Sequence, residues 1–141
     1  MTEAVFQPQG LQPTDEQQRI MLARVRHLLI EANAGAAKTT TLALRIGQAL
    51  LRGADPRRIL VLTYTAPAVQ AMRERLAAVG IAPDVVAALA VHTFEDFCLR
   101  LLRQIEGEAV PVLETPEQSA PRVLQAIEAV FAASADDPHH E

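Results

Sequence analysis

One stretch of the chain has the residue types of a phosphate-binding loop that leads into a helix. Small residues are followed by a lysine and two threonines: Ala32, Asn33, Ala34, Gly35, Ala36, Ala37, Lys38, Thr39 and Thr40. Successive backbone N–H groups at a helix N-terminus bind phosphate oxygens, and the helix dipole favours their negative charge. In such a loop Lys38 would reach the outer phosphates, and the Thr39 hydroxyl would ligate Mg²⁺. The stretch predicts ATP and Mg²⁺ as ligands.

The stretch departs from the full phosphate-loop pattern at two positions, because Ala32 and Ala37 stand where that pattern has glycine. A positive φ at Ala37 would cost about 1–2 kcal/mol, which weakens a site with many phosphate contacts without abolishing it. Lys38 is the single lysine among thirteen basic residues, and a compact ammonium is what the site needs. The alternative is an ordinary turn of small residues beside a surface lysine.

Three strand–helix units are expected to position this loop. Apolar runs predict buried strands over 25–32, 59–63 and 85–91. Each run is followed by residues with helical periodicity, which predict helices from Lys38 to a stop at Gly53, from Thr65 to Gly80, and from Thr93 through Leu102. Repeated strand–helix units imply right-handed crossovers. The expected fold is α/β, with a parallel sheet covered by helices on both faces.

Weaker patterning flanks these units and suggests the domain boundaries. Residues 1–13 lack periodicity and predict a flexible arm, while Thr14 and Gln17 form a capping box that starts a short helix. Prolines at 111, 116 and 121 interrupt the chain before a helix from about 122 to 135. We therefore expect an arm over 1–13, one domain over 14–106, and a proline-broken helical segment over 107–141.

Composition excludes several classes of protein. The net charge of −4 provides no basic field, so any nucleic-acid binding must come from a local site. No apolar run approaches the length of a membrane span, and the acidic start is not a signal peptide, so a soluble cytoplasmic protein is expected. Cys98 is alone, which excludes an internal disulfide framework and a cysteine-based zinc site.

With these residues in view, the chain resembles the N-terminal part of the UvrD/Rep family of superfamily-one DNA helicases. Residues 14–17 resemble the family's Q motif, whose glutamine reads adenine, although a plain helix cap explains Gln17 equally well. Residues 62–76 resemble motif Ia and residues 91–98 the Thr-Phe segment that follows it, both on the single-stranded DNA side of the motor. The DNA-binding residues implied by the resemblance are Tyr64, Thr65, Thr93 and Phe94.

Two departures weaken the expected DNA contact. Ala66 and Pro67 replace the Asn-Lys of motif Ia and so remove a cation, and Glu95 with Asp96 place two negative charges near the expected polyanion.

The resemblance covers about residues 11–105 and implies an incomplete P-loop NTPase domain of the RecA-like kind, helicase subdomain 1A. Residues 107–141 would then begin the inserted helical subdomain 1B. The carboxylate pair that holds Mg²⁺ for hydrolysis and the second RecA-like domain are not found, so the chain alone is expected neither to hydrolyse ATP nor to unwind DNA. The remainder of the helicase, or a partner chain, would supply them. Two alternatives stay open: a small P-loop phosphotransferase, and a non-catalytic regulatory module with a helicase-like fold.

Overall fold

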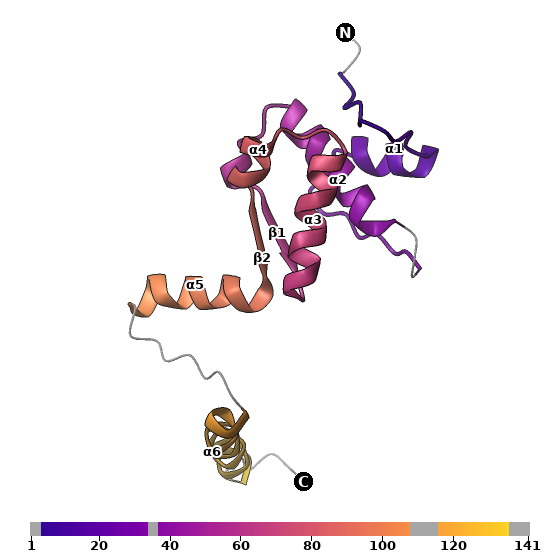
Figure 1. Cartoon of the computed structure of the whole chain (residues 1–141). Coiled ribbons are helices and arrows are strands. Elements are labelled where there is room, and N and C mark those ends of the chain that lie inside the picture. Colours follow the sequence, from indigo (N-terminus) through magenta and orange to yellow (C-terminus); the bar gives the residue numbers. More distant parts are fainter. Residues whose placement is uncertain (1–3, 34–36, 108–115, 136–141) are drawn as a thin grey trace. The chain divides into compact units, whose positions relative to one another are not determined.

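The computed structural model describes residues 4–33, 37–107 and 116–135. The chain divides into two units, Met1–Leu101 and Leu102–Glu141, which we describe separately. In the described residues two strands stand among the helices (Figure 1). The elements follow in the order α1 (Asp15–Leu22), α2 (Lys38–Leu51), η1 (Pro56–Arg58), β1 (Leu60–Thr63), α3 (Ala66–Ala78), α4 (Pro83–Ala88), β2 (Ala90–Thr93), α5 (Phe94–Glu106) and α6 (Pro116–Ala135).

The described sheet consists of β1 and β2, which pair in parallel with Leu60 opposite Ala90 and Thr63 opposite Thr93. The helix α3 connects the two strands and contacts both of them, and it also contacts α2. A parallel pair joined through helices is the arrangement that the strand–helix pattern predicted. The structure thus shows a small mixed α/β unit.

The predicted strand over residues 25–32 is wrong. This segment has no regular secondary structure, and its apolar side chains are exposed, with Leu29 at 85%. A strand is stable only beside another strand, and within the described residues β1 and β2 pair with each other and not with this segment. Its apolar run is typical of a buried strand, but among the residues that the structure describes no strand pairs with it.

The predicted strand over residues 85–91 is wrong for most of its length. Residues 83–88 form α4, and the strand β2 occupies residues 90–93 instead. Pro83 stands in the first turn of α4 and Asp84 complements its dipole, while alanines favour helix over strand. These local signals outweighed the two valines that suggested a strand.

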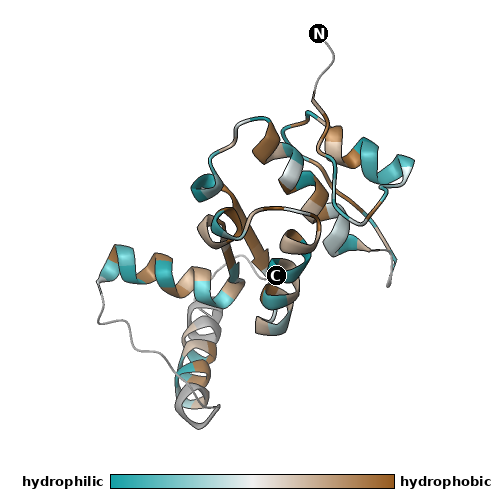
Figure 2. Cartoon of the chain, turned by 45° about the horizontal axis from the view of Figure 1, so that its top comes forward, coloured by the Kyte–Doolittle hydropathy of each residue, from teal (hydrophilic) through white to brown (hydrophobic). Residues whose placement is uncertain are grey.

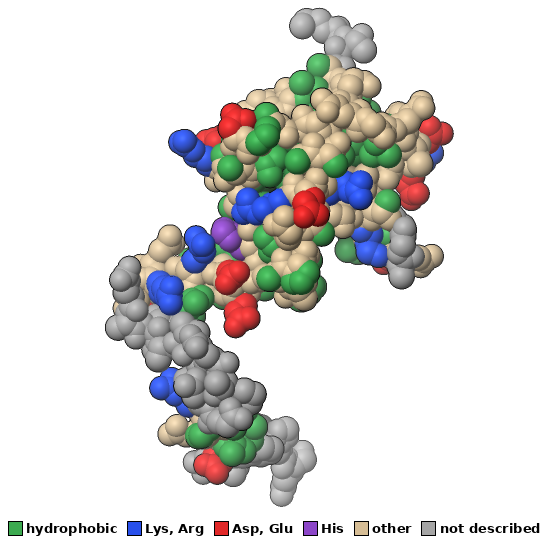
Figure 3. All heavy atoms as spheres, in the orientation of Figure 1, with side chains coloured by type: hydrophobic (Ala, Val, Ile, Leu, Met, Phe, Trp, Pro, Cys, Tyr) green, Lys and Arg blue, Asp and Glu red, His purple; other side chains and the backbone are tan. Residues whose placement is uncertain are grey.

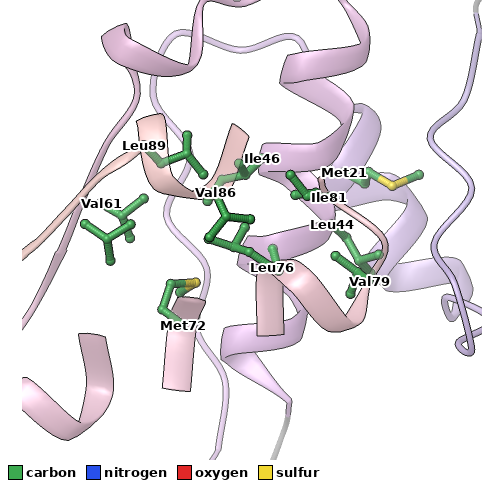
Figure 4. Close-up of a cluster of buried hydrophobic side chains, with 12 residues drawn as sticks. Met21, Leu44, Ile46, Val61, Met72, Leu76, Val79, Ile81, Val86 and Leu89 are labelled. Atoms are coloured by element: carbon green, nitrogen blue, oxygen red, sulfur yellow. The ribbon is translucent and has the colours of Figure 1, made fainter. Parts of the chain in front are cut away.

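The helices of the first unit bury one apolar core (Figure 4). The largest fully buried apolar side chains come from α1, α2, α3 and β2 and from Val79 after α3: Met21, Leu44, Leu76, Val79 and Val91. The hydropathy colouring shows the two strands as mainly apolar (Figure 2), and Val61 of β1 and Val91 of β2 are buried in the core. This core holds α2, and therefore its N-terminus, in place.

Residues 4–12, which we expected to belong to a flexible arm, form no helix or strand but contact the domain at defined points. The Phe6 N–H donates to Gln48 Oε1 at 2.7 Å, and Gln48 Nε2 donates to the Ala4 carbonyl at 2.9 Å. Gln48 is fully buried, and the Gln9 N–H donates to the Val79 carbonyl at 3.0 Å. These bonds tie the segment to α2 and to the end of α3.

The helix α6 begins at Pro116, six residues before the predicted start, and contains Pro121 within it. Pro121 loses one helical hydrogen bond and its ring crowds the preceding turn, but the surrounding Glu, Gln and Ala residues favour helix. In the helix α5, the apolar side chains of Leu101 and Ile105 are exposed.

None of the helices in the described part of the chain has the length and apolarity that crossing a membrane requires.

Candidate functional site

The N-terminus of α2 is left without a side-chain cap. The helices α1, α3 and α5 are each capped by a threonine hydroxyl, from Thr14, Thr65 and Thr93 respectively. The first turn of α2 also carries no acidic residue. Because the first N–H groups of a helix need acceptors, this terminus is open to an anion.

The residue that precedes α2 has a left-handed backbone conformation. Ala37 has φ 50° and ψ 34°, and it is the single non-glycine residue with positive φ in the described part of the chain. This is the conformation considered for Ala37 from the sequence, and it costs about 1–2 kcal/mol. Residues 34–36 of the predicted loop lie outside the described residues. Ala32 and Asn33 have no regular secondary structure, and α2 begins only at Lys38, after the left-handed Ala37.

The Lys38 side chain turns back over the start of the loop. Its ammonium group donates to the Ala32 carbonyl at 3.1 Å and to the Asn33 carbonyl at 2.8 Å. These two bonds use two of its three protons and hold the charge beside the open N-terminus of α2. The positive charge and the N–H groups of the uncapped helix end therefore lie together, which is the combination that a phosphate group requires.

A cavity of about 690 Å³ lies between α1 and this loop. Its volume lies within the range of small-molecule sites. Apolar side chains of Ile20, Ile30 and Leu42 are combined there with polar groups of Gln17 and Lys38. The other lining residues are Thr14, Glu16, Glu31, Ala32, Asn33, Ala37 and Thr41. An apolar wall beside a few polar groups suits a flat heterocycle with charged substituents.

Gln17 lies in the wall of the cavity and is held from two sides. Its Oε1 accepts from the Thr14 N–H at 3.1 Å, and its Nε2 donates to Thr41 Oγ1 at 3.3 Å. The capping box predicted from the sequence is confirmed, since the Gln17 N–H also donates to Thr14 Oγ1. Sequence reasoning missed Thr41, because its partner Gln17 is 24 residues away.

The two threonines at the start of α2 have different environments. Thr39 is exposed in the first turn, whereas Thr40 is 7% exposed and does not line the cavity. An exposed hydroxyl beside a phosphate site fits Mg²⁺, which keeps most of its water and phosphate ligands. The described residues contain no cluster of three or more His, Cys, Asp or Glu side chains that would hold a metal ion. Of the two threonines, Thr39 therefore has the accessible hydroxyl.

A second group of predicted residues lies where β1 and β2 end. The rings of Tyr64 and Phe94 are 5.2 Å apart between centroids and are tilted by 36°. Tyr64 is 88% exposed and Phe94 is 44% exposed. Thr63 pairs with Thr93 in the parallel register, so both aromatic residues follow the same edge of the sheet. The structure therefore brings this predicted pair together on the surface.

The threonines of this group cap helices. Thr65 Oγ1 accepts from the Ala68 N–H at 3.3 Å, and Thr93 Oγ1 accepts from the Asp96 N–H at 3.0 Å. Thr93 is nearly buried, whereas Thr65 is exposed. Of these two hydroxyls, that of Thr65 is the more accessible.

The charges near this edge are mixed. Glu95 and Asp96 are exposed in the first turn of α5, where they complement the helix dipole. Basic and acidic side chains are interspersed over the face seen in Figure 3. Any polyanion bound there is held by local contacts rather than by a broad positive field.

Comparisons with known proteins agree on one family. A model described as the UvrD/REP helicase N-terminal domain matches residues 13–130. The chain is 34% identical to an ATP-dependent helicase/nuclease subunit from Exiguobacterium sibiricum, over 94% of this chain and 13% of that protein. It is 42% identical to the ATP-dependent DNA helicase PcrA of Leuconostoc citreum over 59% of this chain and 11% of the relative. It is 37% identical to the ATP-dependent DNA helicase UvrD1 of Mycobacterium bovis over 70% of this chain and 13% of the relative.

Proposed function

Because the chain belongs to the UvrD/REP helicase N-terminal domain family, we propose that it is the ATP-binding portion of an ATP-dependent helicase that moves along single-stranded DNA. The observation that carries the proposal is the open N-terminus of α2, with Lys38 beside it and a cavity next to it. On this proposal the protein works in the compartment that holds the DNA, which is the cytoplasm expected from the sequence.

In the proposed complex, residues 32–40 surround the phosphates of ATP. Lys38 exchanges its bonds to the Ala32 and Asn33 carbonyls for bonds to the outer phosphates, and the Thr39 hydroxyl ligates Mg²⁺. The adenine lies in the cavity, where the Gln17 amide reads its edge and Ile20 and Ile30 contact its faces. Magnesium supplies charge neutralisation between the phosphates when bound.

We propose further that these 141 residues bind nucleotide without turning it over or unwinding DNA. The chain spans 13% or less of the length of the three relatives named above. Hydrolysis needs a carboxylate pair that holds Mg²⁺ and orients water, and the sequence pattern assigns no residue of this chain to that role. The remainder of the helicase, or a partner chain, supplies these groups. We also assign residues 107–141 to the start of an inserted helical subdomain, a proposal supported by the described helix α6 (Pro116–Ala135).

Titration of the chain with Mg²⁺ and a fluorescent ATP analogue tests the nucleotide site. We expect a dissociation constant in the micromolar to millimolar range, because one half of a cleft makes only part of the contacts. Unlabelled ATP should displace the analogue, and adenosine should compete much less well because it lacks phosphates. A folded chain that shows no displaceable binding contradicts the proposal and favours the non-catalytic module.

The exposed ring of Tyr64 is the proposed platform for a DNA base. Base–aromatic stacking contributes about 1–3 kcal/mol per base, so Tyr64→Ala should weaken binding of an oligothymidine about 5- to 150-fold, whereas Tyr64→Phe should retain most of it. Fluorescence anisotropy of a labelled oligothymidine measures binding by the wild type and both variants. In the wild type, quenching of tyrosine emission also reports directly on this ring, since Tyr64 is the sole tyrosine and the chain has no tryptophan. DNA that binds equally well to Tyr64→Ala would show that the platform lies elsewhere.

A further inference from the structure

A chain of hydrogen bonds connects the wall of the cavity to the turn before α2. Gln17 Nε2 donates to Thr41 Oγ1 at 3.3 Å, and Thr41 Oγ1 donates to the Ala37 carbonyl at 3.2 Å. The Thr41 side chain is 5% exposed and lines the cavity together with Gln17, Ala37 and Lys38. The hydroxyl of Thr41 therefore lies between the side chain proposed to read the base and the loop proposed to bind the phosphates.

The direction of these bonds determines which way the Gln17 amide faces. A hydroxyl has one proton, and Thr41 gives that proton to the Ala37 carbonyl. The Thr41 hydroxyl can then only accept a hydrogen bond from Gln17, so the amide must present its NH₂ group to Thr41. On the other side, the Thr14 N–H requires the amide oxygen. Reversal of the amide would place two donors together at Thr14 and two acceptors together at Thr41.

Hydrogen bonds between α1 and α2 also restrict the position of Gln17. Arg45 of α2 donates to the Ile20 carbonyl at 2.7 Å and to the Ala23 carbonyl at 3.1 Å. These bonds hold the C-terminal end of α1 against α2, while the capping box orders its N-terminal end. Gln17 thus has little freedom of movement apart from rotation of its own amide, and that rotation is what Thr41 restricts.

We infer that Thr41 is a positioning residue that makes the site selective for adenine over guanine; this inference rests on the proposed nucleotide-binding function. With one lone pair and one N–H already used, the Gln17 amide keeps one lone pair and one N–H for a ligand. Adenine offers a matching donor and acceptor at its N6 and N7 atoms, whereas guanine offers acceptors at both O6 and N7. An amide fixed in this orientation can therefore hydrogen-bond to both atoms of adenine. With guanine, the amide oxygen of Gln17 would face the O6 acceptor, which is unfavourable.

The test is the ratio of ATP to GTP affinity for the 141-residue chain and two variants. Wild type should prefer ATP by about tenfold or more, and Thr41→Val should reduce this preference to within about threefold, since valine fills the space but cannot hydrogen-bond. Thr41→Ser keeps the hydroxyl and should restore the preference. Binding of inorganic tripolyphosphate should change little in all three chains, which distinguishes positioning of Gln17 from general damage to the loop.

Three outcomes decide whether Thr41 sets the preference for ATP over GTP. An ATP preference that survives in Thr41→Val, while tripolyphosphate still binds, overturns the role of Thr41 and leaves the nucleotide site intact. A wild-type chain that binds neither nucleotide nor tripolyphosphate overturns the proposed function and this inference with it. If Gln17→Ala loses the preference and Thr41→Val causes no further loss in that background, the two residues act as one unit, as inferred.

Discussion

Replacing Leu44 with alanine should lower the free energy of unfolding by about 2–5 kcal/mol, because removal of a buried leucine side chain loses transfer free energy and leaves a cavity. Leu44 is fully buried in the middle of α2, which contacts both α1 and α3. Domains of this size are stable by only about 5–15 kcal/mol, so the variant should unfold at a much lower urea concentration. Urea denaturation followed by far-UV circular dichroism measures the change.

Leu29→Ala is the matched control for Leu44→Ala, since it removes the same atoms from a side chain that is 85% exposed. We expect its free energy of unfolding to stay within about 0.5 kcal/mol of wild type. A large loss at Leu29 would mean that residues 25–32 are buried, as the apolar pattern alone predicted. The pair of variants therefore tests the corrected position of this segment as well as the core.

The helices α1, α2 and α3 were predictable because their signals are local. The capping box of Thr14 and Gln17, the proline at the start of α3, and the glycines that follow α2 and α3 each act within a few residues of the helix they bound. Gly53 and Gly80 have φ of 90° and 96°, so the glycines at these stops have the conformation that other residues avoid. These elements were found at or close to their predicted positions.

The strands were less predictable because a strand depends on a partner that the local pattern does not reveal. The run over 59–63 contains β1, which pairs with β2. The apolar run over 25–32 pairs with no strand among the described residues. The same limit applies to the candidate site. Its local part, Ala37 to Thr39, was proposed from residue types, but the contact of Gln17 with Thr41 depends on how α1 packs against α2.

The second large effect is expected at Lys38. Lys38→Ala removes the cation beside the open N-terminus of α2, and charge-assisted hydrogen bonds contribute about 1.5–3 kcal/mol each, so affinity for the ATP analogue should fall about 10-fold to 150-fold. Lys38 is exposed, and its present acceptors are backbone carbonyls that water can reach. The free energy of unfolding should therefore change by less than about 1 kcal/mol.

The matched control is Arg58→Ala, which removes one exposed positive charge from η1 and should leave nucleotide affinity unchanged. A comparison at two salt concentrations separates the local contact from the overall charge, because salt screens distant charges more strongly than a direct bond. Lys38→Arg adds a further test, since a planar guanidinium cannot take the place of a compact ammonium over a tight loop, and we expect an intermediate affinity. Equal affinities for Lys38→Ala and wild type would remove the basis for a phosphate site at α2, whatever the family of the chain.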